Sequence, residues 1–270
     1  RRAGMGGDKE RGKLPGLHKK LKPTGKLSAK GGVRTTLTTA ELRSACGGDK
    51  YPLVLDLSPP HFRLASQEVL ARIPPNALKE LDVSDNELTE LNVLQAQGKL
   101  RRLAADRNCL ASVSFVGLES LQHLSLAHNA LRRLPAMLDL QRLVYLSLRG
   151  NRLEGGLAHL AQAKALRLLD LSKNDLDLSM HGLHRELLLP LKELPRLTHL
   201  SLDDNPMERK LRAFRAFVVF ELPQLEHLDG ARVTKEERVA AFQADDAGEF
   251  AARAAPRPRA PPPSAPAADA

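Results

Sequence analysis

Aromatic residues and cysteine are scarce in this chain of 270 residues. Phe, Tyr and Trp make up only 3% of the sequence and Trp is absent, so a core must be built from aliphatic side chains. The two cysteines, Cys46 and Cys109, form neither a CxxC pair nor a metal-binding spacing, which argues against a disulfide framework and favours a reducing compartment. Because no run of 18 apolar residues occurs, we expect no membrane span.

Catalytic motifs are lacking as well. The sequence contains no G-x-S-x-G nucleophile motif and no H-E-x-x-H zinc motif. Ser125, His123 and Asp106 fall at nearby positions of the pattern described below, but no oxyanion donor accompanies them. We therefore expect a protein that is not an enzyme and that has no cofactor, no metal ion and no small-molecule substrate.

The charge of the chain is concentrated at its beginning. Residues 1–50 hold 13 Lys or Arg and 4 Asp or Glu, whereas the remaining residues hold 28 of each, so the net charge of +9 comes from this arm. We predict that the arm touches an acidic surface, such as tubulin tails or nucleic acid, while the alternative is a solvated disordered tail. Its candidate contact residues are Lys13, Lys19, Lys20, Lys22, Lys26 and Lys30. Because the chain begins with Arg1 rather than Met, we expect it to be a fragment or a trimmed product.

One sequence motif occurs six times between Leu78 and Asn205. The copies follow the pattern L-x-x-L-x-L-x-x-N-x-L, as in LQHLSLAHNAL from Leu121 and LVYLSLRGNRL from Leu143. Successive asparagines are separated by 22, 21, 22, 23 and 31 residues. This is the signature of leucine-rich repeats, and it predicts an α/β solenoid with a parallel concave sheet and a helical or irregular convex side.

Each L-x-L segment predicts a short strand whose leucines point into the core and whose intervening residues point outward. In leucine-rich repeats the Asn side chain satisfies backbone groups of the turn in its own and the adjacent repeat. The longest interval contains an insertion, residues 180–194, whose leucine spacing predicts an amphipathic helix.

The repeat pattern and the composition of the flanking segments divide the chain into five predicted regions. These are a basic arm (1–50), an irregular first repeat or N-terminal cap (51–77), six repeats (78–207), a C-terminal cap (208–243) and a Pro/Ala-rich disordered tail (244–270). Within the C-terminal cap we expect a helix over residues 211–220 and a second helix that begins at the capping box of Thr234 and Glu237. Val239 and Phe242 are expected to pack that second helix onto the end of the solenoid.

The segments LPQLEHLDG from Leu222 and VTKEER from Val233 resemble the C-terminal cap of leucine-rich repeat proteins. With the 22-residue repeats, they make the chain similar to the subclass typified by the nuclear regulator of protein phosphatase 1. That subclass also holds a spliceosomal A-prime protein, tubulin-folding cofactor E and many axonemal proteins. The resemblance implies a cytoplasmic, non-catalytic adaptor in a cytoskeletal or ciliary assembly. The alternatives that it implies are a regulatory subunit of a protein phosphatase and a nuclear ribonucleoprotein component.

The outward strand positions define a predicted protein-binding face. Its centre has His123, Tyr145 and Leu168 over small residues, a composition that suits an interface core. The full set of predicted contact residues is Arg102, His123, Tyr145, Arg149, Leu168, Asp170, Lys173, His199, Asp203 and His227. The alternative is that a partner binds the convex side or an end. His199 and His227 fall on neighbouring strands, but without a third ligand they do not predict a metal site.

Overall fold

The computed structural model describes residues 53–57, 64, 67–134, 137, 139–177, 184–210 and 213–246. The basic arm with its six candidate lysines, Cys46 and most of the Pro/Ala-rich tail lie outside the described residues, so the predictions made for them stay predictions. The described part holds no helix that is both long enough and apolar enough to cross a membrane.

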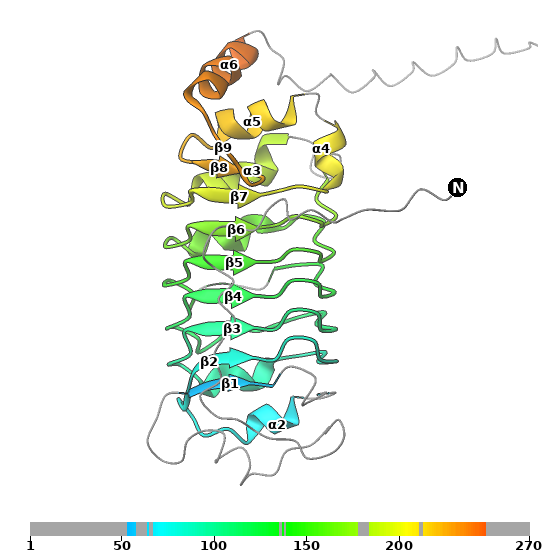
Figure 1. Cartoon of the computed structure of the whole chain (residues 1–270), viewed down its shortest axis with the longest axis vertical. Helices are drawn as coiled ribbons and strands as arrows, with labels where there is room; N and C mark the ends of the chain where they lie inside the picture. The colour runs from blue at the N-terminus through cyan, green and yellow to red at the C-terminus, as the bar shows by residue number, and fades with distance from the viewer. Residues whose placement is uncertain are drawn as a thin grey trace, which may run out of the picture.

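The described strands form one sheet in chain order (Figure 1). They are β1 (Leu53–Asp56), β2 (Leu78–Asp82), β3 (Arg102–Ala104), β4 (His123–Ser125), β5 (Tyr145–Ser147), β6 (Leu168–Asp170), β7 (His199–Ser201), β8 (His227–Leu228) and β9 (Ala231–Arg232). Strands β1 to β8 pair in parallel, and β9 turns back to pair antiparallel with β8. The predicted parallel solenoid sheet is confirmed.

The leucine between two outward positions anchors every central strand. Leu103, Leu124, Leu146 and Leu169 are paired in register on adjacent strands and are at most 4% exposed. Each strand therefore contributes one layer to a continuous aliphatic core, and a neighbouring layer covers it. The sequence pattern alone predicts this alternation, because the side-chain period of a strand is two residues.

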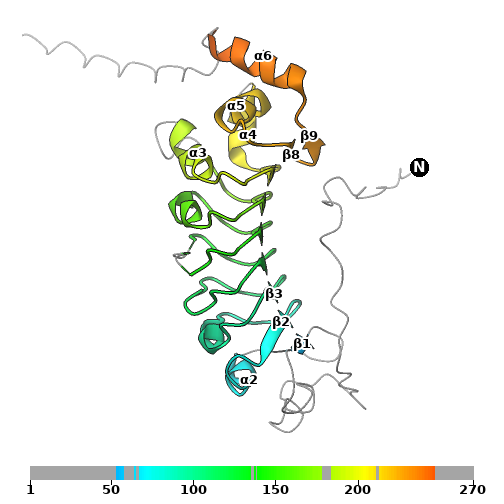
Figure 2. The same cartoon turned by 90° about the vertical axis from the view of Figure 1, so that its left-hand side faces the viewer.

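Short helices and turns form the side opposite the sheet (Figure 2). They include α2 (Glu68–Ala71), η2 (Asn92–Ala96), η3 (Leu157–Gln162) and α3 (His184–Lys192). Helix α3 corresponds to the helix predicted in the insertion, and it buries Leu188 and Leu191. The helical or irregular convex side is therefore as predicted.

The repeated asparagines are buried and tie each repeat to the one before it. Asn129, for example, donates from Nδ2 to the carbonyls of Ala105 (2.9 Å) and Leu126 (3.0 Å), and its Oδ1 accepts from the amide of Leu110 (3.1 Å). Equivalent bonds are made by Asn86, Asn108, Asn151, Asn174 and Asn205. The asparagine ladder predicted from the pattern is confirmed, since each turn would otherwise leave buried backbone groups unpaired.

In the described residues, three helices follow the last full repeat: α4 (Pro206–Lys210), α5 (Phe214–Glu221) and α6 (Lys235–Asp246). Figure 1 shows α5 across the end of the strand stack, where Phe217 and Val218 are buried. The capping box is present, with the amide of Glu237 donating to Thr234 Oγ1 at 3.2 Å and the amide of Thr234 donating to the Glu237 carboxylate at 2.9 Å.

The expected packing of Val239 was wrong, because this residue is 56% exposed. Phe242 is 59% exposed, but its ring does pack against the cap, edge to face with the ring of Phe220 on α5 at 5.4 Å. Ala241 is buried in the same helix. The cause is the anchoring of Arg238, whose guanidinium donates to two backbone carbonyls and turns the face of Arg238 and Ala241 inward. The helix also continues to Asp246, so its last turn occupies the start of the predicted disordered tail.

Candidate functional site

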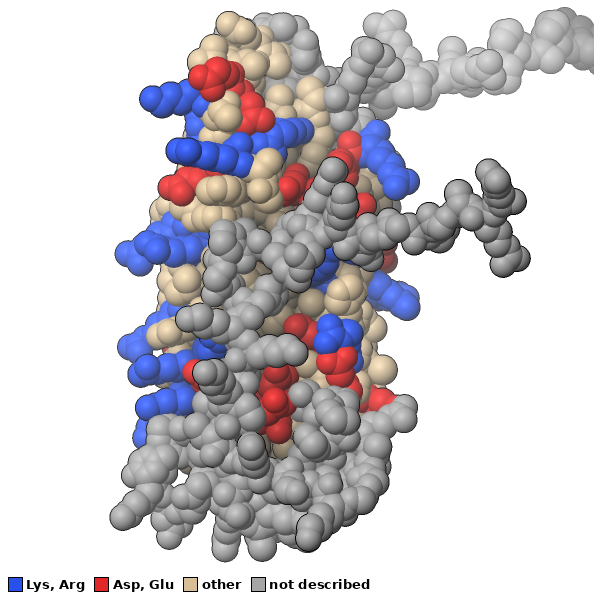
Figure 3. Space-filling model, in the orientation of Figure 1, with Lys and Arg blue, Asp and Glu red and all other residues tan. Residues whose placement is uncertain are grey.

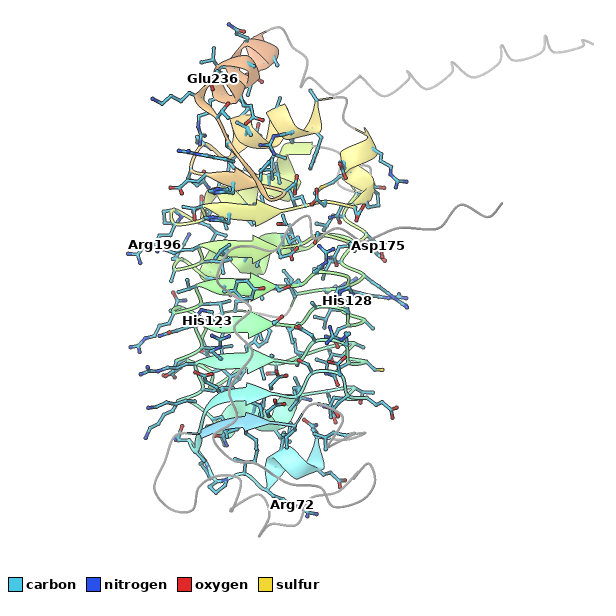
Figure 4. The ribbon with its side chains drawn as sticks, viewed as in Figure 1. Arg72, His123, His128, Asp175, Arg196 and Glu236 are labelled. Atoms are coloured by element: carbon cyan, nitrogen blue, oxygen red, sulfur yellow. The ribbon has the colours of Figure 1, made fainter. Side chains whose placement is uncertain are left out.

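The strand register brings most of the predicted contact residues into one column. Arg102, His123, Tyr145, Leu168, His199 and His227 are direct partners on successive strands. All six are half-buried, and the labelled His123 in Figure 4 lies on the open face of the sheet. The repeat period therefore places these residues in one continuous strip, although its first and last members are more than 120 positions apart in the sequence.

The centre of this strip is uncharged near neutral pH. The rings of His123 and Tyr145 lie 6.2 Å apart at 32°. Burial raises the pKa of Tyr145 to about 12, so its hydroxyl keeps its proton. Burial, with the nearby Arg102 guanidinium as a lesser cause, lowers the pKa of His123. Together with Leu168 these rings offer an amphipathic surface of the kind that protein interfaces favour.

A hydroxyl–carboxylate network supports the next column toward the carboxyl ends of the strands. Ser172 Oγ donates to Asp170 Oδ1 at 2.6 Å, and Arg149 donates to the same Oγ at 2.7 Å. On earlier strands Ser125 donates to Asp106 at 2.6 Å. The predicted contacts Arg149 and Asp170 are thus held in fixed positions by partners that the sequence did not identify, because the pairing depends on the turn geometry between repeats.

Two histidines close the strip at its C-terminal end. The rings of His199 and His227 stack 4.4 Å apart at an interplanar angle of 10°. Burial and the neighbouring His227 lower the pKa of His199. Across the described residues there is no cluster of three or more His, Cys, Asp or Glu suited to a metal ion.

The remaining predicted residues occupy the edges of the face. Arg102 Nε lies 3.9 Å from Glu80, and Asp203 lies beyond the carboxyl end of β7. Lys173 does not join the columns: it is exposed at the turn before Asn174, with φ of 55°, and its Nζ lies 4.0 Å from Asp204. Lys173 lies in the turn that follows strand β6, so its side chain points away from the concave face.

One titratable residue of this face, Asp229, is not among the predicted contact residues. Asp229 follows β8 with φ of 53°, and its Oδ1 accepts from the amide of Leu202 at 2.6 Å. Burial, together with the charge of Asp203, raises the pKa of Asp229 to about 6, although the Leu202 amide opposes that rise.

Replacing Asp229 with Asn is expected to stabilise the protein at pH 7 by about 3 kcal/mol. The folded state holds the Asp229 proton more tightly than the unfolded chain, so the stability of the natural protein falls as pH rises from about 4 to about 6. Asn keeps the acceptor oxygen, tolerates positive φ and carries no charge. Urea unfolding from pH 4 to 7.5 measures the difference, which should vanish at the acidic end. The exposed Asp175→Asn variant is the control, and an identical pH slope in Asp229→Asn and the natural protein would contradict the assignment.

Comparisons with known proteins agree with this architecture. The leucine-rich repeat family matches residues 113–255. A probable inactive serine/threonine-protein kinase of Dictyostelium discoideum is 34% identical over 82% of this chain, which spans 11% of that protein. The leucine-rich repeat-containing protein ODA7 of Chlamydomonas reinhardtii is 36% identical over 30% of this chain, which spans 17% of that protein.

Among solved structures, the Drosophila melanogaster SNF/U2A' complex contains a chain with 28% identity and a TM-score of 0.45. The match covers 52% of this chain and 82% of that one. Leucine-rich repeat proteins typically bind other proteins, and their fold is typically non-catalytic. Because the family match covers more than half of the length of this chain, the chain belongs to the leucine-rich repeat family.

Proposed function

We propose that the chain is a non-catalytic adaptor whose concave face holds a partner protein, with Tyr145 and Leu168 as the central contacts. The observation that carries the proposal is the neutral, half-buried centre of the strip.

The cellular setting that we propose is a cytoskeletal or ciliary assembly in the cytoplasm. Its support is the likeness of the repeats and of the LPQLEHLDG and VTKEER segments to axonemal members of the 22-residue subclass. In this proposal the terminal helices act as the cap of that subclass, and the basic arm contacts tubulin tails. Microtubule co-sedimentation that is unchanged when residues 1–50 are deleted would contradict the role of the arm.

Two alternatives follow from the same resemblance. A phosphatase regulator predicts that a purified phosphatase catalytic subunit binds the concave face at micromolar concentration. A ribonucleoprotein component, which would work in the nucleus, predicts that nuclease treatment removes the recovered partners. The identity of the proteins captured by affinity purification distinguishes both alternatives from the cytoskeletal proposal.

The direct test is affinity purification from native lysate followed by mass spectrometry. The double variant Tyr145→Ala, Leu168→Glu should lose one set of partner proteins at least tenfold, because interface energy concentrates in central aromatic and apolar contacts. The matched control is Val116→Ala, Leu189→Glu, which changes two exposed apolar residues, one of them on α3 of the convex side. If the control loses the partners and the concave variant keeps them, the concave-face proposal is wrong.

A further inference from the structure

Basic side chains gather along the edge of the solenoid where the strands begin. In Figure 3 they form a blue margin on the left side of the molecule, and Figure 4 labels Arg196 on that margin. The residues that make up this basic edge are Lys99, Arg101, Arg142, Lys164, Arg167 and Arg196, and all six are exposed. The carboxylates at the same edge are Glu119, Asp139, Glu193 and Glu226, so the six cations outnumber the four carboxylates and the net charge is positive.

The repeat backbone sets the spacing of this edge. The amide of Gln122 donates to the carbonyl of Arg101, and the ladder continues through Val144 to Arg167. Arg101 and Arg167 are therefore three strands apart, about 14 Å at the usual strand separation. The backbone of Arg101 and of Arg167 is held by the next repeat, whose amides donate to both carbonyls.

Most of these cations lack an internal counter-ion. Lys164 forms an exposed ion pair with Glu193 at 3.3 Å. Within the described part of the chain, the side chains of Arg101, Arg142 and Arg167 have neither a hydrogen-bond nor an ion-pair partner. Unpaired guanidinium groups are the favoured protein ligands for carboxylates, which they bind through two parallel hydrogen bonds.

We propose that the basic edge is a second docking surface, separate from the concave face, and that it binds an acidic polypeptide segment. Two features favour a polypeptide over a nucleic acid. None of the six edge residues is aromatic, so bases have no stacking platform. In addition, an open hollow lined by Glu119, Asp139 and Arg142 interrupts the row. A phosphate chain would place negative charge beside these carboxylates, whereas a polypeptide can place a neutral residue there.

The spacing also defines the segment. Extended chain advances about 3.4 Å per residue, so the 14 Å between Arg101 and Arg167 corresponds to about four residues. The edge therefore fits two acidic blocks that are separated by a short neutral stretch. With the concave face occupied by a folded partner, such a segment would attach a second protein or a second part of the same one.

Fluorescence anisotropy with the full chain tests this surface. The probe is a labelled peptide of two Glu-Glu-Asp blocks joined by Ser-Gly-Ser-Gly, and a labelled twelve-nucleotide single-stranded RNA is the comparison. The double variant Arg142→Glu, Arg167→Glu should bind the peptide at least tenfold more weakly than the natural protein. The matched control is Arg132→Glu, Arg133→Glu, two exposed arginines that follow Asn129 and lie beyond the opposite ends of the strands.

The control variant has the same net charge as the edge variant and keeps the basic arm, so a difference between the two variants reports the edge itself. The control should lose less than threefold, and circular dichroism melting should show that both variants fold. Equal weakening by the two variants would reduce the effect to net charge and overturn the proposal. A loss of RNA binding without a loss of peptide binding in the edge variant would assign the edge to nucleic acid, and it would also overturn the proposal.

Discussion

Replacing Asn151 with Ala is expected to lower the free energy of unfolding by about 3 kcal/mol. The Asn151 amide donates at 2.9 Å to the carbonyls of Leu126 and Leu148, and its oxygen accepts from the amide of Leu131 at 3.1 Å. Alanine removes all of these bonds and leaves buried backbone groups without partners, at a cost of about 1–3 kcal/mol for each unsatisfied group unless water enters. Urea denaturation with a constant m-value measures the change.

The matched control for Asn151 is the same substitution at an exposed position. Asn92 donates to Glu90 at 2.9 Å on the surface, so Asn92→Ala should change stability by no more than about 0.5 kcal/mol. If both variants lose the same amount, the asparagine ladder is not a source of stability. A large loss for Asn151 alone would show that the repeats are held together by polar ties as well as by leucine packing.

Replacing Lys192 with Met is expected to destabilise the fold by about 3 kcal/mol. Lys192, at the end of α3, forms an ion pair with Glu221 on α5, and the Glu221 side chain is only 1% exposed. Removing the ammonium takes one ion-pair partner from the buried Glu221 carboxylate, which typically costs more than the pair itself contributes. Thermal and urea unfolding of the variant measure the loss.

A second substitution tests the cause of that loss. The double variant Lys192→Met, Glu221→Leu removes both charges and should recover most of the stability, since buried pairs often tolerate apolar replacement. Lys164→Met breaks an exposed ion pair with Glu193 instead, so it should cost less than about 1 kcal/mol. A double variant as unstable as Lys192→Met would show that shape, rather than charge, decides the contact.

The Lys192–Glu221 pair also gives the insertion a structural role. Gln224 donates to the carbonyl of Leu191 at 3.2 Å, a second tie between α3 and the segment that follows α5. The lengthened repeat thus supports the terminal helices, and we expect Lys192→Met to loosen that end first. Hydrogen exchange of the α5 amides, which should become faster than that of the β4 amides, measures this effect.

Much of the fold was determined by the sequence pattern itself. The spacing of the leucines predicted where the strands lie, because Leu146 and its equivalents alternate with outward residues at the two-residue period of a strand. It also fixed the role of Asn129 and the column that holds Tyr145 and Leu168, since residues at equal repeat positions must stack in register. These features depend on local geometry repeated at a constant interval, and such geometry is readable without coordinates.

Tertiary structure decided the features that depend on non-equivalent segments. The exposure of Val239 follows from the anchoring of α6 by Arg238, and no residue period predicts that anchoring. Burial of Glu221 depends on the path of the insertion helix, which brings Lys192 against α5. The raised pKa of Asp229 arises from its burial, and the row of cations that includes Arg142 and Arg167 arises from side chains at different positions of the repeat. Charges and contacts of this kind depend on distances between elements, whereas sequence periodicity specifies only what every repeat shares.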